Sequence, residues 1–149
     1  MKKLFIIIIA ALLCCLIGCR YYTPSAKEVA ETIEEYTNVL IPEEAKLEEY
    51  YTSSVFMHGH LPEYCIFTFD TEPTEFLEEY KFKVNTDKTK QKTIYEKIKF
   101  NNENYKMMIP ESSYVNWNED YLCHWDLKRD YYFIYQTRTS KLIVMNFMP

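Results

Sequence analysis

The sequence predicts a small single-domain α+β protein with an antiparallel sheet. The chain has 149 residues, a length that suits one domain with a modest core. Apolar residues near the front recur at three- and four-residue steps, as they do on one side of a helix. Two runs near the end, 131–136 and 141–147, are rich in β-forming residues. Helices in the front and middle combined with several strands favour the α+β class.

The first expected element is a helix over residues 25–38. Ser25 and Glu28 have the spacing of a capping box. Pro42 prevents easy continuation beyond this stretch. The apolar stripe that should pack on the sheet consists of Ala26, Val29, Ala30, Ile33 and Tyr36.

Two strands and a short second helix are expected next. Residues 50–57 and 64–70 have strand composition, and His58-Gly59-His60-Leu61-Pro62 between them reads as a turn. Residues 74–81 predict a short helix with apolar residues on its inner side.

In the rest of the chain, the sequence predicts secondary structure clearly only near the C-terminus. Residues 85–104 are ambiguous, and 93–100 fit a helix and a strand equally well. The runs 131–136 and 141–147, split by the polar residues 137–140, predict a C-terminal hairpin.

Composition excludes several function classes. The chain has two glycines, so the glycine-rich loops that cradle phosphates or dinucleotides are missing from the sequence. A net charge of −5 argues against general nucleic-acid binding. No cofactor is expected.

The first nineteen residues carry a targeting signal. Lys2 and Lys3 precede an apolar run over 4–17, which is short for a membrane span but suits a secretory signal. Leu16-Ile17-Gly18-Cys19 follows, and this segment resembles the signal peptide and lipobox of bacterial lipoproteins.

That resemblance implies cleavage before Cys19 and a diacylglycerol on its thiol. The expected organisation is a signal peptide over 1–18, a lipidated cysteine and tether over 19–24, and one domain over 25–149. The mature protein would face outside the cytoplasm on the cell envelope, held by its acyl chains. Arg20, rather than Asp, follows Cys19, which favours the outer membrane if the cell has one.

Two cysteines remain in the expected domain, Cys65 and Cys123. An exported protein can keep a disulfide, so these two residues are candidates for a bridge. The alternative is that both are reduced and fill the core as small apolar side chains.

Histidines offer little support for metal or catalytic chemistry. His58 and His60, with the Cys123-His124 pair, lack the spacing of a known metal-binding motif, so no metal site is predicted. The residue types for a Cys–His catalytic pair are present, but no catalytic sequence motif surrounds them.

The last signals are charge asymmetry and aromatic residues. Eight glutamates lie within 28–49 and seven lysines within 81–99. The lysines could face anionic lipid headgroups, but a solvated face is favoured.

The chain also carries an aromatic segment at 117–125, whose members could stack on sugars, anchor a partner or fill the core. The candidate binding surface in that segment consists of Trp117, Tyr121, His124 and Trp125.

These observations lead to one functional hypothesis and two alternatives. The leading hypothesis is a non-enzymatic, lipid-anchored module that binds another protein of the envelope, of the immunity or inhibitor type or as an accessory of an envelope complex. The alternatives are a cell-wall glycan-binding module that uses exposed aromatics, and a small hydrolase.

Overall fold

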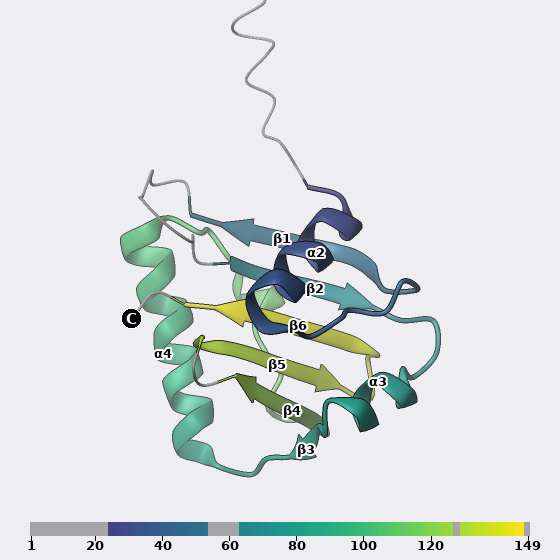
Figure 1. The fold of residues 1–149 in the computed structure, drawn as a ribbon. Coiled ribbons are helices and arrows are strands. Elements are labelled where there is room, and N and C mark those ends of the chain that lie inside the picture. The colour runs from purple at the N-terminus through teal and green to yellow at the C-terminus, as the bar shows by residue number, and fades with distance from the viewer. Residues whose placement is uncertain (1–23, 54–62, 127–128, 148–149) are drawn as a thin grey trace, which may run out of the picture.

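The computed structural model describes residues 24–53, 63–126 and 129–147 (Figure 1). The expected signal segment, the lipidation site Cys19 and the turn at 58–62 lie outside these residues. Within the described ranges, no helix has the length and apolar character needed to cross a bilayer.

Six strands form one antiparallel sheet with the order β1-β2-β6-β5-β4-β3. Long-range pairing places β6 between β2 and β5, so the C-terminal hairpin occupies the middle of the sheet. The strands are β1 (Lys46–Thr52), β2 (Glu63–Thr68), β3 (Lys83–Val84), β4 (Tyr121–Asp126), β5 (Tyr131–Gln136) and β6 (Lys141–Asn146).

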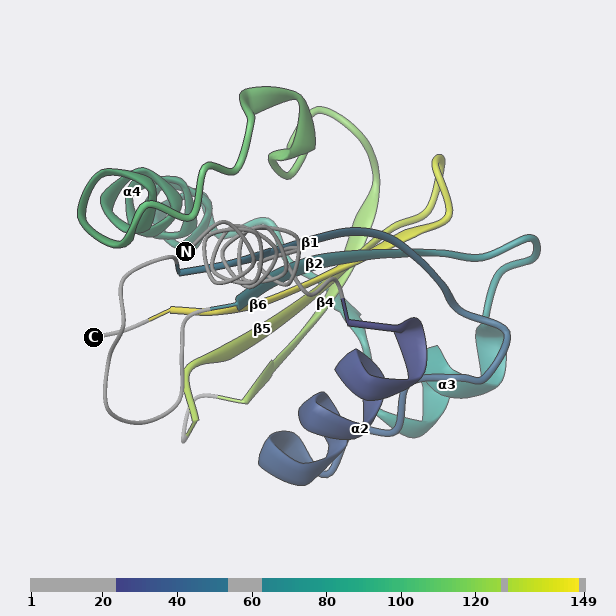
Figure 2. The same ribbon diagram turned by 90° about the horizontal axis from the view of Figure 1, so that it is seen from above.

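Helices cover both faces of this sheet. Figure 2 shows α2 (Ala26–Thr37) and α3 (Thr74–Glu79) on one face and α4 (Lys88–Tyr105) on the other. Each face has its own apolar core because the strands, buried on both sides, point alternate side chains to opposite faces. A short 3₁₀ turn, η1 (Glu111–Ser113), lies in the segment that returns from α4 to β4. The α+β class, the antiparallel sheet and the C-terminal hairpin are confirmed.

Helix α2 forms where the sequence predicts it, but Tyr36, expected in its buried stripe, is 39% exposed. The Ser25 side chain accepts a hydrogen bond from the Glu28 amide, and the Glu28 carboxylate accepts one from the Ser25 amide at 2.7 Å. Val29 and Ile33 are buried against the sheet. Asn38 ends the helix in the left-handed conformation, with its amide bonded to the Glu34 carbonyl.

Helix α4 resolves the ambiguous stretch 85–104. Asp87 caps its start by accepting hydrogen bonds from the Thr89 and Lys90 amides. The helix buries a narrow stripe of three residues, Ile94, Ile98 and Asn101. Most of its surface is therefore polar and exposed.

Candidate functional site

The two cysteines lie on opposite faces of the sheet. Cys65 pairs in register with Val144 and belongs to the core under α2 and α3. Cys123 pairs with Ile134 and belongs to the core under α4. Three strand spacings of about 4.8 Å each also separate β2 from β4, which is too far for a bridge. Both thiols are free and buried, so the candidate Cys65–Cys123 disulfide is not formed.

Neither thiol is activated as a nucleophile. Burial raises the pKa of Cys65 well above its usual range, and burial raises the pKa of Cys123 to about 11. His124 follows Cys123 in β4 and therefore points to the other face of the sheet, where its ring lies 5.7 Å from that of Phe133 and 5.8 Å from that of Phe82. The described residues contain no group of three metal-ligating side chains, and His58 and His60 lie outside them.

The sheet separates His124 from the other aromatics of the candidate binding surface. Trp117, Tyr121 and Trp125 all belong to the core beside α4. The Trp117 ring packs edge-on against Tyr121 at 5.2 Å, and the Tyr121 hydroxyl donates to the Asn85 carbonyl. The four residues therefore do not form one surface, and the two tryptophans are half-buried.

The outer face of Trp125 is also occupied. The Lys90 ammonium lies over its ring, 5.7 Å from the centroid, and Tyr132 packs against it at 5.3 Å. A sugar would have to displace this cation–π contact in order to stack on the indole.

A half-buried carboxyl, Glu63, lies where β1 pairs with β2. The Tyr50 hydroxyl donates a 2.8 Å hydrogen bond to Glu63 Oε1. Burial raises the pKa of Glu63, although the bond from Tyr50 lowers it in part. Burial also raises the pKa values of Tyr50 and Tyr131 beside it. Burial therefore disfavours the charged forms of these groups, and the Tyr50 hydroxyl fixes the Glu63 carboxyl within the β1–β2 pair.

A groove lies on the surface between α2 and α3. It consists of two hollows of about 560 Å³ and about 510 Å³. The hollows adjoin because they share four lining residues in one loop, Leu40, Ile41, Pro42 and Glu43. We call this feature the acidic groove.

Alternation along the loop explains why the acidic groove has an apolar edge. Val39 and Ile41 are buried, so the extended chain between them directs Leu40 outward, where 57% of it is exposed. The Thr37 side chain accepts from the Val39 amide, and the Tyr80 hydroxyl accepts from the Leu40 amide at 3.0 Å. The loop is thereby tied to both helices.

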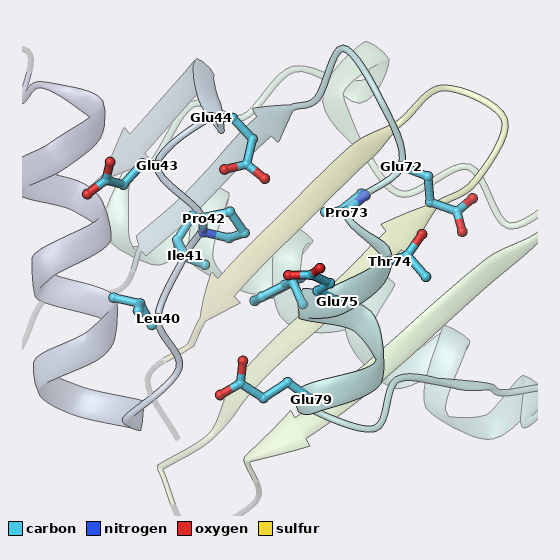
Figure 3. Close-up of a pocket in the computed structure, with 11 residues that line it drawn as sticks. Leu40, Ile41, Pro42, Glu43, Glu44, Glu72, Pro73, Thr74, Glu75 and Glu79 are labelled. Atoms are coloured by element: carbon cyan, nitrogen blue, oxygen red, sulfur yellow. The ribbon is translucent and has the colours of Figure 1, made fainter.

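A tight turn then presents two carboxylates. The Ala45 amide donates to the Pro42 carbonyl at 3.0 Å, which closes a turn with Glu43 and Glu44 at its tip. Figure 3 shows Glu75 and Glu79 extending from α3 toward this loop.

The electrostatic character of the groove is strongly negative. Its sole lining cation among the described residues is Lys27, which lies 3.7 Å from a Glu31 carboxylate oxygen. A surface of this kind favours a cationic ligand, because a bound positive charge relieves the repulsion between neighbouring carboxylates. The lining glutamates are Glu31, Glu34, Glu43, Glu44, Glu72, Glu75 and Glu79.

The glutamate-rich stretch is visible in the sequence, but the groove is not. The excess of acid over 28–49 is visible in the sequence, whereas Glu75 and Glu79 join it only because α3 packs on the same face of the sheet as α2. The alternation Val39-Leu40-Ile41 before Pro42 was the available local signal.

No protein family model matches the sequence, and no curated protein or solved structure is significantly similar to it.

Proposed function

We propose that the protein is a lipid-anchored, non-enzymatic binding module of the cell envelope, and that its acidic groove binds a basic segment of another protein. The observation that supports this proposal is the combination of seven lining glutamates with an outward Leu40. The expected lipobox at Leu16-Ile17-Gly18-Cys19 supports the envelope location.

The groove offers two complementary contributions to such an interaction. Its carboxylates would steer a cationic partner and select against acidic ones, an effect that salt weakens. Leu40 supplies apolar area for the centre of the contact, and its complete burial would contribute about 1–2 kcal/mol. An immunity, inhibitor or accessory role fits a small domain that acts through one face.

The alternative of a glycan-binding module has weaker structural support. Stacking on sugars needs exposed aromatic faces, but Trp125 already carries Lys90 over its ring and Trp117 packs against Tyr121. The raised pKa values of the two thiols likewise favour a binding role over hydrolysis.

The direct test is recovery of the partner from membranes solubilised with mild detergent, using the tagged full-length chain. The groove variant replaces four glutamates by glutamine at 43, 44, 75 and 79. Its control carries the same number of such replacements at exposed positions outside the groove, Glu35, Glu78, Glu103 and Glu111. Both variants change the net charge equally, so only the location of the carboxylates differs.

We expect one basic protein to be recovered with the wild-type chain and with the control variant. The groove variant should lose it, and added salt should weaken its recovery. Equal recovery with the two variants would contradict the proposal. Recovery of wall glycan alone, lost on Trp117→Ala or Trp125→Ala, would favour the alternative.

A further inference from the structure

The C-terminal end of α4 forms an exposed corner that joins apolar and cationic side chains. Met108 and Phe100 are 80% and 48% exposed, so both side chains are available to an apolar environment. Lys99 precedes Phe100 in the last two turns of the helix, and Lys106 is the residue that ends it. We call Lys99, Phe100, Lys106 and Met108 the α4 corner.

The backbone holds this corner in place. Asn102 bonds both the amide and the carbonyl of Ile109, at 2.9 Å and 2.8 Å. Lys106 and Met108 both adopt the left-handed conformation, with φ values of 55° and 59°. Ordinary side chains adopt this conformation rarely, so the exposure of Met108 results from a fixed backbone path.

The corner belongs to the positively charged side of the molecule. Helix α4 carries five lysines and two glutamates, and Lys106 follows directly. Lys97 pairs with Asp130, whereas the Lys99 ammonium lies over the Tyr95 ring and that of Lys106 donates to the Glu103 carbonyl. Within the described residues, neither corner lysine has a carboxylate partner, so both can bind anionic groups.

The corner also lies on the edge of the sheet from which the chain would run to its anchor. Figure 1 shows the start of α2 and the end of α4 at the same edge, beside β1. The Ser53 hydroxyl at the end of β1 donates to the Tyr105 carbonyl at 2.9 Å, which ties that edge to α4. Five extended residues, 20–24, span at most about 17 Å, so an anchor on Cys19 would keep this edge close to the bilayer.

We propose that the α4 corner rests on the anionic lipid headgroups of the membrane that holds the anchor. Phe100 and Met108 enter the interfacial layer, while Lys99 and Lys106 bind phosphate groups. This contact rests on the lipid-anchoring part of the proposed function. It would place most of the acidic groove away from the contact, on the other face of the sheet, with the Ala26–Lys27 end of the groove toward the membrane edge.

The test uses full-length protein, purified from membranes and reconstituted into vesicles. Met108→Cys carries a nitroxide label, and Val84→Cys is the control because Val84 is 72% exposed but lies on the opposite edge strand, β3. The native Cys65 and Cys123 are buried. The wild-type chain, treated with the same reagent, shows whether either of them takes up the nitroxide label. Vesicles contain phosphatidylglycerol with phosphatidylethanolamine, or phosphatidylcholine alone.

The readout is the accessibility of the label to apolar oxygen relative to a polar nickel reagent. We expect this ratio to rise at position 108 in the anionic vesicles and to stay at its aqueous value at position 84. A second pair of variants in the Met108→Cys background separates the role of charge. Lys99→Gln with Lys106→Gln should lower the ratio, whereas Lys88→Gln with Lys92→Gln, near the other end of α4, should leave it unchanged.

Equal, water-like ratios at positions 108 and 84 would overturn the proposal. Spin–spin broadening at position 108 would also overturn it, because it would identify a second copy of the chain as the occupant. Flotation of the same sample with the vesicles reports the anchor separately. Loss of flotation would therefore contradict lipidation, while flotation with a water-like ratio at position 108 would contradict only the corner contact.

Discussion

Asn102 provides the sharpest prediction about stability, because its side chain makes three hydrogen bonds with one short loop. It bonds the Ile109 amide and carbonyl, and its Nδ2 lies 3.1 Å from the Tyr114 hydroxyl. Each bond contributes about 0.5–1.5 kcal/mol net, and Asn102→Ala leaves the backbone groups of a buried residue unpaired. We expect the variant to lower the free energy of unfolding by about 2–4 kcal/mol.

The matched control is Asn104→Ala in the same helix. Asn104 is exposed and donates one bond to the Phe100 carbonyl, so we expect a change within about 0.5 kcal/mol. Both variants gain the helix propensity of alanine equally, and the difference between them isolates the loop contacts. Urea unfolding followed by circular dichroism measures that difference. A value for Asn102→Ala within about 0.5 kcal/mol of the control would refute the role of Asn102 in fixing the loop.

Three further predictions concern the half-buried Glu63, the two buried thiols and the buried Asn101. The folded-state pKa of Glu63 is raised, so the folded protein keeps a proton that the unfolded chain loses, and stability falls as pH rises through that window. Glu63→Gln should therefore be more stable than wild type at pH 7 and converge with it near pH 4 in urea unfolding; an equal offset at all pH values would contradict this. Cys65 and Cys123 should resist thiol reagents in the native domain and both react after denaturation without reductant, whereas a lack of reaction would reveal a disulfide. Asn101 is fully buried with its Oδ1 unpaired among the described residues, so Asn101→Leu should raise the free energy of unfolding by about 1–2 kcal/mol, and a clear loss in thermal unfolding would argue against that packing.

Local chemistry explains which elements the sequence predicts well. Helix α2 combines a capping box with a regular apolar stripe, so propensity and packing agree. The hairpin of β5 and β6 forms from two uninterrupted β-rich runs. Helix α4 lacks such agreement, because its stripe is narrow and one of its three buried residues is Asn101. Its helical character depends on the Asp87 cap and on tertiary packing, which a periodicity search detects poorly.

The candidate site illustrates a different limit. The aromatic segment at 117–125 includes most of a strand, β4, and the period of two in a strand places His124 and Trp125 on opposite faces. Grouping them as one surface overlooked that alternation. The acidic groove could be predicted only in part, because Glu43 and Glu79 are far apart in sequence and line one hollow only through the packing of α2 and α3 on one face.

The arrangement of charge connects the two proposed surfaces. Glutamates gather around the groove on one face of the sheet, and the lysines of α4 lie on the other. A domain with such a division can hold an anionic membrane and a cationic protein at once without placing like charges together. We therefore expect that mutations can separate membrane contact from partner binding.

The most direct test of the central claim is site-specific photo-crosslinking in cells. A photoreactive residue placed at Leu40, in the acidic groove, should crosslink to one basic envelope protein, and the same residue at Val84 should not. The glutamine replacements at 43, 44, 75 and 79 should abolish the crosslink from position 40. A crosslink pattern that is the same from both positions, or that survives those replacements, would contradict the account.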